Sequence, residues 1–159
     1  MEKLLELLEQ DCTMPIGALA AAAGMSEEET RQTIKKYEDD RTILGYKAIV
    51  DWDRVRKETV TALIEVNVTP QSKDGFDRIA ERIYQSDEVE SMYLMSGSCD
   101  LTVIISGRTL RQVAQFVGER LAPIQGVTGT ATHFILKKYK EKHHMFRIDP
   151  VQEEGLLFT

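Results

Sequence analysis

The second half of the chain alternates between strand-like and helix-like hydrophobic patterns, and the order of these patterns constrains the fold more than any other feature. Residues 60–69 alternate apolar and polar side chains with the two-residue period of a strand. Residues 76–84 carry apolar side chains at helical spacing. The pattern continues with strands over 89–96 and 101–106, a helix over 109–121 and a strand over 127–139. The predicted order β-α-β-β-α-β is the ferredoxin-like arrangement, with both helices on one face of an antiparallel sheet.

The second face of this predicted sheet has no helix to cover it. Strand 89–96 carries Met92 and Leu94 on one side and Tyr93 and Met95 on the other, so both of its faces are apolar. Apolar patches that stay uncovered in a monomer mark surfaces of association. We therefore predict a homodimer that forms through the sheets.

The first half of the chain predicts three short helices and a β-prone segment. Apolar stripes at helical spacing run through residues 4–8, 16–23 and 30–37, and Gly24 ends the second helix. The segment 43–48 that follows is short and β-prone. This order predicts a helix-turn-helix with a small wing. A generic three-helix bundle is the alternative interpretation.

Composition excludes several classes of protein. No apolar run in the 159 residues approaches the roughly 20 that a membrane helix needs, and acidic residues interrupt the N-terminal apolar stretch where a signal peptide would lie. Cys12 and Cys99 lie far apart without a CxxC pair, which predicts a reducing cytoplasm and no disulfide scaffold. We expect no metal, no cofactor, no catalytic residues and no membrane partner. The formal net charge is −6, and residues 1–52 hold 11 acidic but only 6 basic side chains.

Four segments of the chain carry a family resemblance. They are Gly24-Met25-Ser26, Ile43-Leu44-Gly45-Tyr46-Lys47-Ala48, Gly97-Ser98-Cys99-Asp100-Leu101 and Gly126-Val127. In this order and spacing they resemble the Lrp/AsnC family of bacterial and archaeal transcription regulators over residues 2–140. The resemblance implies an α+β protein in which a winged helix-turn-helix binds double-stranded DNA and a ferredoxin-like domain dimerises and senses small molecules, usually amino acids. It also implies assembly of dimers into tetramers or octamers, with effector sites between subunits.

The predicted organisation has four parts. Residues 1–50 form the DNA-binding domain, 51–58 a polar linker, 59–142 the effector-binding and oligomerisation domain, and 143–159 a C-terminal tail.

Polar side chains around the third helix and the wing are the candidates for DNA contact: Ser26, Thr30, Arg31, Gln32, Lys35, Lys36, Arg41 and Lys47. The alternative is an ordinary solvated helix face. Acidic residues at 27–29 and 38–40 depart from the family pattern and repel phosphate. We therefore predict weak DNA binding by each domain and a need for multimeric avidity.

The candidates for effector binding lie in the hairpin and the last strand: Gly97, Ser98, Cys99, Asp100, Thr130 and Thr132. Asp100 is the natural partner for an α-ammonium group. The alternative is that Asp100 closes the turn by accepting hydrogen bonds from backbone amides.

These features predict a DNA-binding transcriptional regulator whose assembly responds to an effector, most simply an amino acid. The first alternative is an amino-acid sensor of the same fold with weak or no DNA binding, which the acidic first half favours. The second alternative is an enzyme of the tetrapyrrole-decarboxylase type. Such enzymes depend on histidines, and the histidines of this chain gather near the tail, which disfavours this alternative.

Overall fold

The computed structural model describes residues 2–55, 59–69, 75–107 and 109–146. The chain forms two compact units, residues 1–48 and 49–159. No helix in the described ranges is both long enough and apolar enough to cross a membrane.

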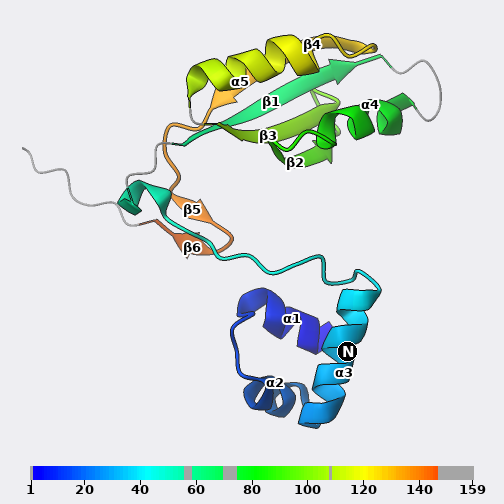
Figure 1. Ribbon diagram of the computed structural model, residues 1–159, viewed down its shortest axis with the longest axis vertical. Helices are drawn as coiled ribbons and strands as arrows, with labels where there is room; N and C mark the ends of the chain where they lie inside the picture. Colours follow the sequence, from blue (N-terminus) through cyan, green and yellow to red (C-terminus); the bar gives the residue numbers. More distant parts are fainter. Residues whose placement is uncertain (1, 56–58, 70–74, 108, 147–159) are drawn as a thin grey trace, which may run out of the picture. The chain divides into compact units, whose positions relative to one another are not determined.

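Three helices make up the first unit: α1 (Glu2–Gln10), α2 (Ile16–Ala23) and α3 (Glu27–Asp39). Leu4, Leu8 and Leu19 form its buried core, and Ile34 and Tyr37 of α3 pack against them. Figure 1 shows the helices in blue and cyan. The apolar stripes of the sequence are therefore the faces that pack together, as predicted.

The turn between α2 and α3 is built from backbone hydrogen bonds and a side-chain cap. Gly24 adopts the left-handed conformation, with φ 71°, and the amide of Met25 donates to the carbonyl of Ala20 at 2.9 Å. Ser26 then caps α3 in a complete capping box with Glu29. This geometry confirms the predicted helix-turn-helix.

The predicted β wing after α3 does not form. Residues 44–50 contain no strand and continue as loop. The segment is held instead by the Ile43 amide, which donates to the Tyr37 carbonyl at 2.8 Å, and by the Tyr46 hydroxyl, which donates to Glu38 at 2.9 Å. A strand needs a neighbour to bond with, and the described part of the first unit contains only helices and loops.

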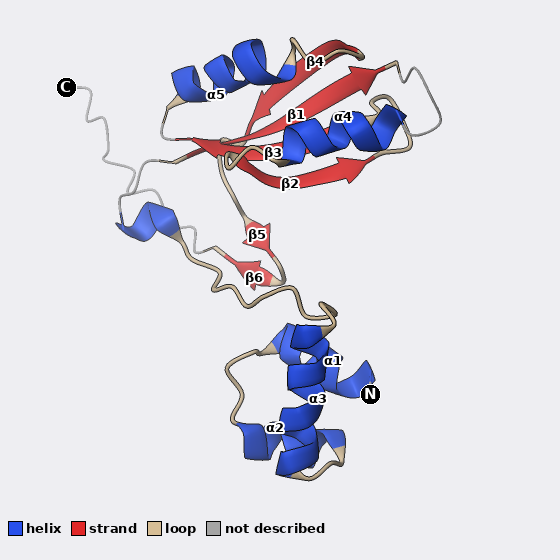
Figure 2. Cartoon of the chain, turned by 45° about the vertical axis from the view of Figure 1, so that its right-hand side comes forward, coloured by secondary structure: helices blue, strands red, loops and turns tan. Residues whose placement is uncertain are grey.

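A four-stranded antiparallel sheet forms the second unit, in the order β2-β3-β1-β4. The strands are β1 (Val60–Val68), β2 (Val89–Leu94), β3 (Leu101–Gly107) and β4 (Val127–Phe134). The helices α4 (Gly75–Tyr84) and α5 (Leu110–Phe116) cover one face of the sheet, and a π-helical turn, η2 (Val117–Leu121), extends α5 (Figure 2). This topology is the predicted ferredoxin-like arrangement.

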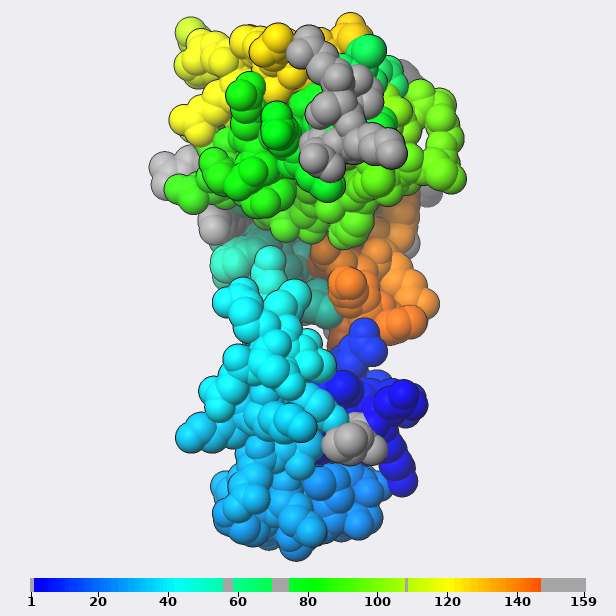
Figure 3. Space-filling view, turned by 90° about the vertical axis from the view of Figure 1, so that its right-hand side faces the viewer, coloured from blue at the N-terminus to red at the C-terminus, as the bar shows by residue number. Residues whose placement is uncertain are grey.

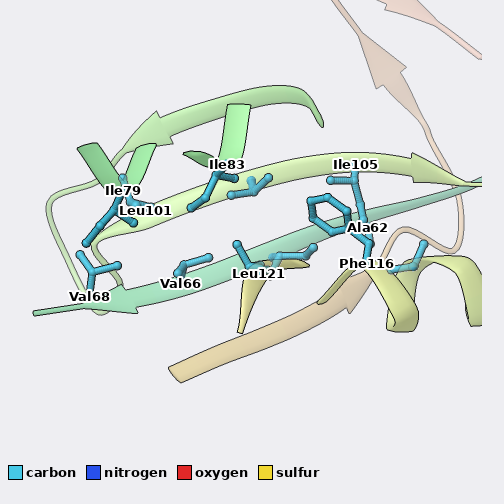
Figure 4. Packing of buried hydrophobic residues seen from close by; sticks show 12 residues of the cluster. Ala62, Val66, Val68, Ile79, Ile83, Leu101, Ile105, Phe116 and Leu121 are labelled. Atoms are coloured by element: carbon cyan, nitrogen blue, oxygen red, sulfur yellow. The ribbon is translucent and has the colours of Figure 1, made fainter. Parts of the chain in front are cut away.

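Alternate residues of the strands build the core against these helices. Ile64 and Val66 of β1 and Val103 of β3 are fully buried. Ile83 and Phe116 meet them from the two helices (Figure 4). Removal of these apolar side chains from water stabilises the packing of the helices on the sheet.

The other face of the sheet is of mixed polarity. Leu63 pairs with Ile104 on β3 and with His133 on β4, and all three are on this face. Leu63 and Ile104 are half-buried, whereas Tyr93 of β2 is exposed. The face thus combines apolar side chains with a His133–Glu65 pair at 3.8 Å.

The last predicted strand is shorter than expected. Strand β4 ends at Phe134, whereas the sequence predicted that it would extend to residue 139. The end of β4 lies close to the start of its neighbour, since the Ile135 amide donates to the Thr61 carbonyl at 2.9 Å and β1 begins one residue earlier, at Val60. A separate hairpin follows, formed by β5 (Lys140–Glu141) and β6 (His144–Met145). A short 3-10 helix, η1 (Trp52–Val55), lies within the predicted linker.

The left-handed conformation at Gly24 predicts a stability cost for Gly24→Ala. A Cβ at this position would meet no atom within 4 Å, so the cost is that of the backbone conformation alone, about 1–2 kcal/mol. Thermal unfolding followed by circular dichroism should show a lower melting temperature. Gly118→Ala, which also meets open space but lacks the positive φ, is the matched control and should be neutral or stabilising. Equal melting temperatures would contradict the turn geometry.

Candidate nucleic-acid interface and effector site

The polar face of α3 is the candidate DNA-contacting surface. Arg31, Gln32, Lys35 and Lys36 are all solvent-accessible at this face. The buried Thr30 and the half-buried Ile34 and Tyr37 are on the opposite face, as the helical spacing predicts. The structure therefore brings four of the candidate side chains together on one solvent-facing surface.

The acidic first turn of α3 engages two of these four side chains. Arg31 Nη2 lies 3.2 Å from Glu27 Oε2, and Gln32 Nε2 donates to Glu28 Oε1 at 2.7 Å. Both members of the Arg31–Glu27 pair are more than half exposed, so the pair contributes at most about 0.2–1 kcal/mol. A phosphate or a base edge can displace contacts this weak. Lys35 and Lys36 form no ion pair with any other described residue.

The two hydroxyls at the start of α3 are already committed to the helix itself. Thr30 is fully buried, and its Oγ1 donates to the carbonyl of Ser26 at 2.8 Å. Ser26 Oγ accepts from the Glu29 amide at 3.2 Å and donates to Glu29 Oε2 at 2.7 Å. Thr30 is therefore a core residue with no surface to offer a phosphate, and Ser26 serves as the cap.

The remaining two DNA candidates follow α3 in the loop. Arg41 and Lys47 are both exposed. Arg41 has φ 62°, a left-handed conformation that non-glycine residues seldom adopt. Before it, Asp40 Oδ1 accepts from the Thr42 amide at 3.0 Å. Both cations are therefore solvent-exposed and follow α3 in the chain.

The connection between β2 and β3 is the candidate effector turn. Gly97 has φ 157°, and Ser98 beside it is exposed. Cys99 is buried rather than exposed, and its Sγ lies 3.6 Å from Thr102 Oγ1. Cys99, which the sequence predicted as an effector-binding residue, therefore offers no thiol at the surface, because the turn folds this side chain inward.

Asp100 is held by the end of β1. Its Oδ2 accepts from the Val68 amide at 2.8 Å, and its own amide donates to the Val66 carbonyl at 3.2 Å. This is the turn-closing role. The second carboxylate oxygen, Oδ1, receives no hydrogen bond from the described residues, so the structural role falls on Oδ2.

The two threonines of β4 do not join the effector turn within the chain. Thr130 pairs with Val66 and Thr132 with Ile64, so both are on the helix-covered face of the sheet. Strand β1 separates them from the β2–β3 connection. Periodicity predicted the strand, but only the register decides which face each hydroxyl occupies.

Two hollows that sequence reasoning missed lie in the second unit. One, of about 120 Å³, lies between α4 and β2, with Phe76, Tyr84, Leu94 and Leu101 in its wall. Leu94 and Leu101 flank the effector turn directly. The other, of about 550 Å³, lies along α5 and the end of β3. Both depend on how a helix packs against a strand, which leaves no local signal in the sequence.

Hydrogen bonds lower the pKa values of three carboxyl groups in the helix-turn-helix unit. The donors are Thr13 for Asp11, Ser26 for Glu29 and Thr42 for Asp40. A carboxyl group whose pKa is depressed on folding stabilises the folded state above its ordinary pKa. That contribution disappears as the pH falls through the lowered pKa.

We therefore expect the unit to lose stability below about pH 4.5, the ordinary pKa of Glu29. Glu29→Gln should flatten the dependence of the melting temperature on pH between about 6 and 3, because one of the three lowered pKa values is removed. Glu6→Gln removes an equal charge from an exposed position on α1 and is the control. A Glu29→Gln curve as steep as the wild-type curve would contradict the capping interaction.

Comparison with known proteins agrees with this arrangement. Residues 2–38 match the model of the AsnC-type helix-turn-helix domain, and residues 61–145 match that of the Lrp/AsnC ligand binding domain. The HTH-type transcriptional regulator YugG of Bacillus subtilis is 44% identical over 145 residues, which cover 91% of this chain and 87% of that protein.

Solved structures share the fold. The leucine response regulatory protein of Mycobacterium tuberculosis has a TM-score of 0.72 at 20% identity and covers 89% of this chain and 94% of its own. A transcriptional regulator from Neisseria meningitidis in complex with L-Met has a TM-score of 0.68 at 22% identity, with 92% of each chain covered. With its helix-turn-helix, its ferredoxin-like sheet and these matches across both units, the chain belongs to the Lrp/AsnC family of transcriptional regulators.

Proposed function

We propose that this regulator acts in the cytoplasm as an oligomer that binds double-stranded DNA through α3 and an amino acid at the Gly97–Asp100 turn. The observation that carries the proposal is the α3 surface, where Arg31, Gln32, Lys35 and Lys36 project together from a capped helix-turn-helix. The recognition helix of this motif enters the major groove and contacts base edges there. Arg31 and Gln32 have the chemistry to contact bases, and the two lysines have the chemistry to contact phosphate.

Oligomerisation compensates for the acidity of the first unit. The sequence of α3 holds five acidic and three basic residues, and Asp40 follows it. A helix with this balance binds a polyanion weakly, and linking several copies raises the overall affinity without any new contact. We propose that a homodimer forms through the helix-free face of the sheet, where Leu63, Ile104 and Tyr93 lie, and that dimers assemble further into tetramers or octamers.

The effector is proposed to use Asp100 and the small hollow beside the turn. In this proposal Asp100 Oδ1 accepts a hydrogen bond from the α-ammonium group, while Oδ2 keeps its bond to the Val68 amide. The hollow between α4 and β2 offers apolar walls to a side chain. The Neisseria meningitidis regulator in complex with L-Met supports an amino acid as the ligand class. Binding that favours one assembly over another would change the spacing of the DNA-contacting helices.

The second candidate function is an amino-acid sensor that binds DNA weakly or not at all. The acidic turn that engages Arg31 and Gln32 favours it. The histidine-dependent enzyme is disfavoured because the members of this family are transcriptional regulators and because the histidines lie on different elements: His133 on β4 and His143 and His144 in the β5–β6 hairpin.

A double variant of the α3 lysines separates these functions. Lys35→Gln with Lys36→Gln should lower DNA affinity at least tenfold and reduce the salt slope of binding by about 0.9 for each phosphate that the variant no longer binds. Gel retardation with long mixed-sequence duplex DNA at low salt, with and without an amino-acid panel, measures this. Lys3→Gln, on the exposed side of α1, should bind as the wild type does. Wild-type protein that retards no DNA under any of these conditions would favour the sensor.

Two substitutions of Asp100 separate its two roles. Asp100→Asn keeps an acceptor for the Val68 amide but removes the charge, so effector affinity should fall about 10- to 100-fold with little change in melting temperature. Asp100→Ala should abolish effector binding and also cost about 1–3 kcal/mol of stability, because the Val68 amide is left without its acceptor. Calorimetry with the natural amino acids and thermal unfolding measure the two effects. Unchanged effector affinity in Asp100→Asn would exclude the ammonium role.

A further inference from the structure

A concentrated positive charge lies in the β5–β6 hairpin and the residues before it. Residues 137–144, with the sequence Lys-Lys-Tyr-Lys-Glu-Lys-His-His, contain four lysines and two histidines against one glutamate. We call these eight residues the basic hairpin. Because the whole chain carries a formal charge of −6, this segment opposes the charge of the rest of the molecule.

The backbone of the basic hairpin presents these charges to solvent. Lys140 pairs with Met145 and Glu141 with His144, so the turn between them consists of Lys142 and His143. Both turn residues have positive φ, 45° and 69°, as a tight two-residue hairpin requires. All residues of the basic hairpin except Lys138 are exposed, and the orange surface in Figure 3 includes this segment.

Little in the described structure neutralises the basic hairpin. Lys138 pairs with Glu141, with their charged atoms 3.1 Å apart. Lys137 Nζ lies 5.3 Å from the centre of the Tyr139 ring, which holds the cation in place without removing its charge. Lys140 and Lys142 take part in no ion pair within the described ranges. Three exposed cations, Lys137, Lys140 and Lys142, are therefore available to a polyanion.

The chemistry of the partner follows from this charge. A DNA duplex carries one negative charge per about 1.7 Å of its axis, and lysine binds phosphate as a point charge without reading bases. In the helix-turn-helix unit acids outnumber cations, since residues 1–52 hold 11 acidic and 6 basic side chains and carry a net charge of −5. We propose that the basic hairpin is a second DNA contact, which binds backbone phosphates through Lys137, Lys140 and Lys142 independently of sequence. This inference rests on the DNA-binding function proposed above.

A second copy of this chain is the competing occupant of the same surface. Leu136, Tyr139 and Met145 are 96%, 62% and 82% exposed, so the hairpin also offers apolar area for self-association. Packing of hairpin against hairpin is disfavoured because the two copies repel each other. Any other part of a second copy offers a net charge of −6 spread over 159 residues, whereas a duplex carries one negative charge per about 1.7 Å of its axis, which favours DNA as the occupant. Self-association through the hairpin is retained as an outcome of the test.

The test is the triple variant Lys137→Gln, Lys140→Gln, Lys142→Gln in the full chain. Its affinity for long mixed-sequence duplex DNA is measured by fluorescence anisotropy across about 50–200 mM salt, a range in which phosphate contacts dominate the change. The slope of log Kobs against log salt should decrease by about 2.7, or about 0.9 for each lysine, and affinity at about 0.1 M salt should fall at least tenfold. The preference among DNA sequences should not change, because lysines that contact phosphate read no bases.

The matched control removes the same charge elsewhere in the second unit. Arg78→Gln, Arg82→Gln and Arg111→Gln replace three exposed cations on α4 and α5 and should leave the slope near the wild-type value. If the hairpin variant has the same salt slope as the control while the wild-type chain still binds DNA, the second contact is overturned and the proposed function stands. A wild-type chain that binds no DNA overturns both. A hairpin variant whose oligomeric state changes in light scattering while its slope does not change assigns the surface to a second copy and overturns the proposal.

Discussion

Strand β1 is bonded along both edges, and the second unit depends on these two antiparallel ladders. Its inward side chains, Ile64 and Val66, are fully buried beneath the helices. Burial of one such side chain is worth about 1.5–3 kcal/mol. The end of the same strand holds Asp100 through the Val66 carbonyl and the Val68 amide. The strand that organises the core therefore also fixes the turn at which an effector is proposed to bind, so ligand contact and core packing share one element.

The helix-turn-helix combines good helix chemistry with poor electrostatics for DNA. Acidic residues in the first turn of α3 suit the helix dipole, and Glu29 completes the capping box. The same turn engages Arg31 and Gln32 and places negative charge where phosphates would lie. Because the Arg31–Glu27 pair is exposed, it is weak enough to exchange for DNA contacts. Helix stability and DNA affinity thus compete within a single turn. In the proposed function, several copies of the chain, and both α3 and the basic hairpin of each copy, contribute to the affinity for DNA.

The distribution of charge gives the two units different tasks. The first unit carries the side chains that can read bases but has an excess of acids. The second carries the basic hairpin, whose lysines can attract a polyanion but cannot read it. If both act on DNA, sequence preference resides in α3 and much of the salt-dependent affinity resides in the hairpin. Such a division lets effector-driven changes of assembly alter binding strength without altering which bases are read.

The sequence by itself determined the order of elements, because hydrophobic period, caps and turn glycines act over a few residues. The β-α-β-β-α-β order, the glycine turn at Gly24 and the Ser26 cap are all of this kind. Tertiary structure decided the features that depend on how strands pair. These are the end of β4 and the face of the sheet that Thr130 and Thr132 occupy. They also include the burial of Cys99 and the hydrogen bond between one oxygen of Asp100 and the Val68 amide of β1. Registers and burial join residues far apart in the chain, so no local pattern encodes them.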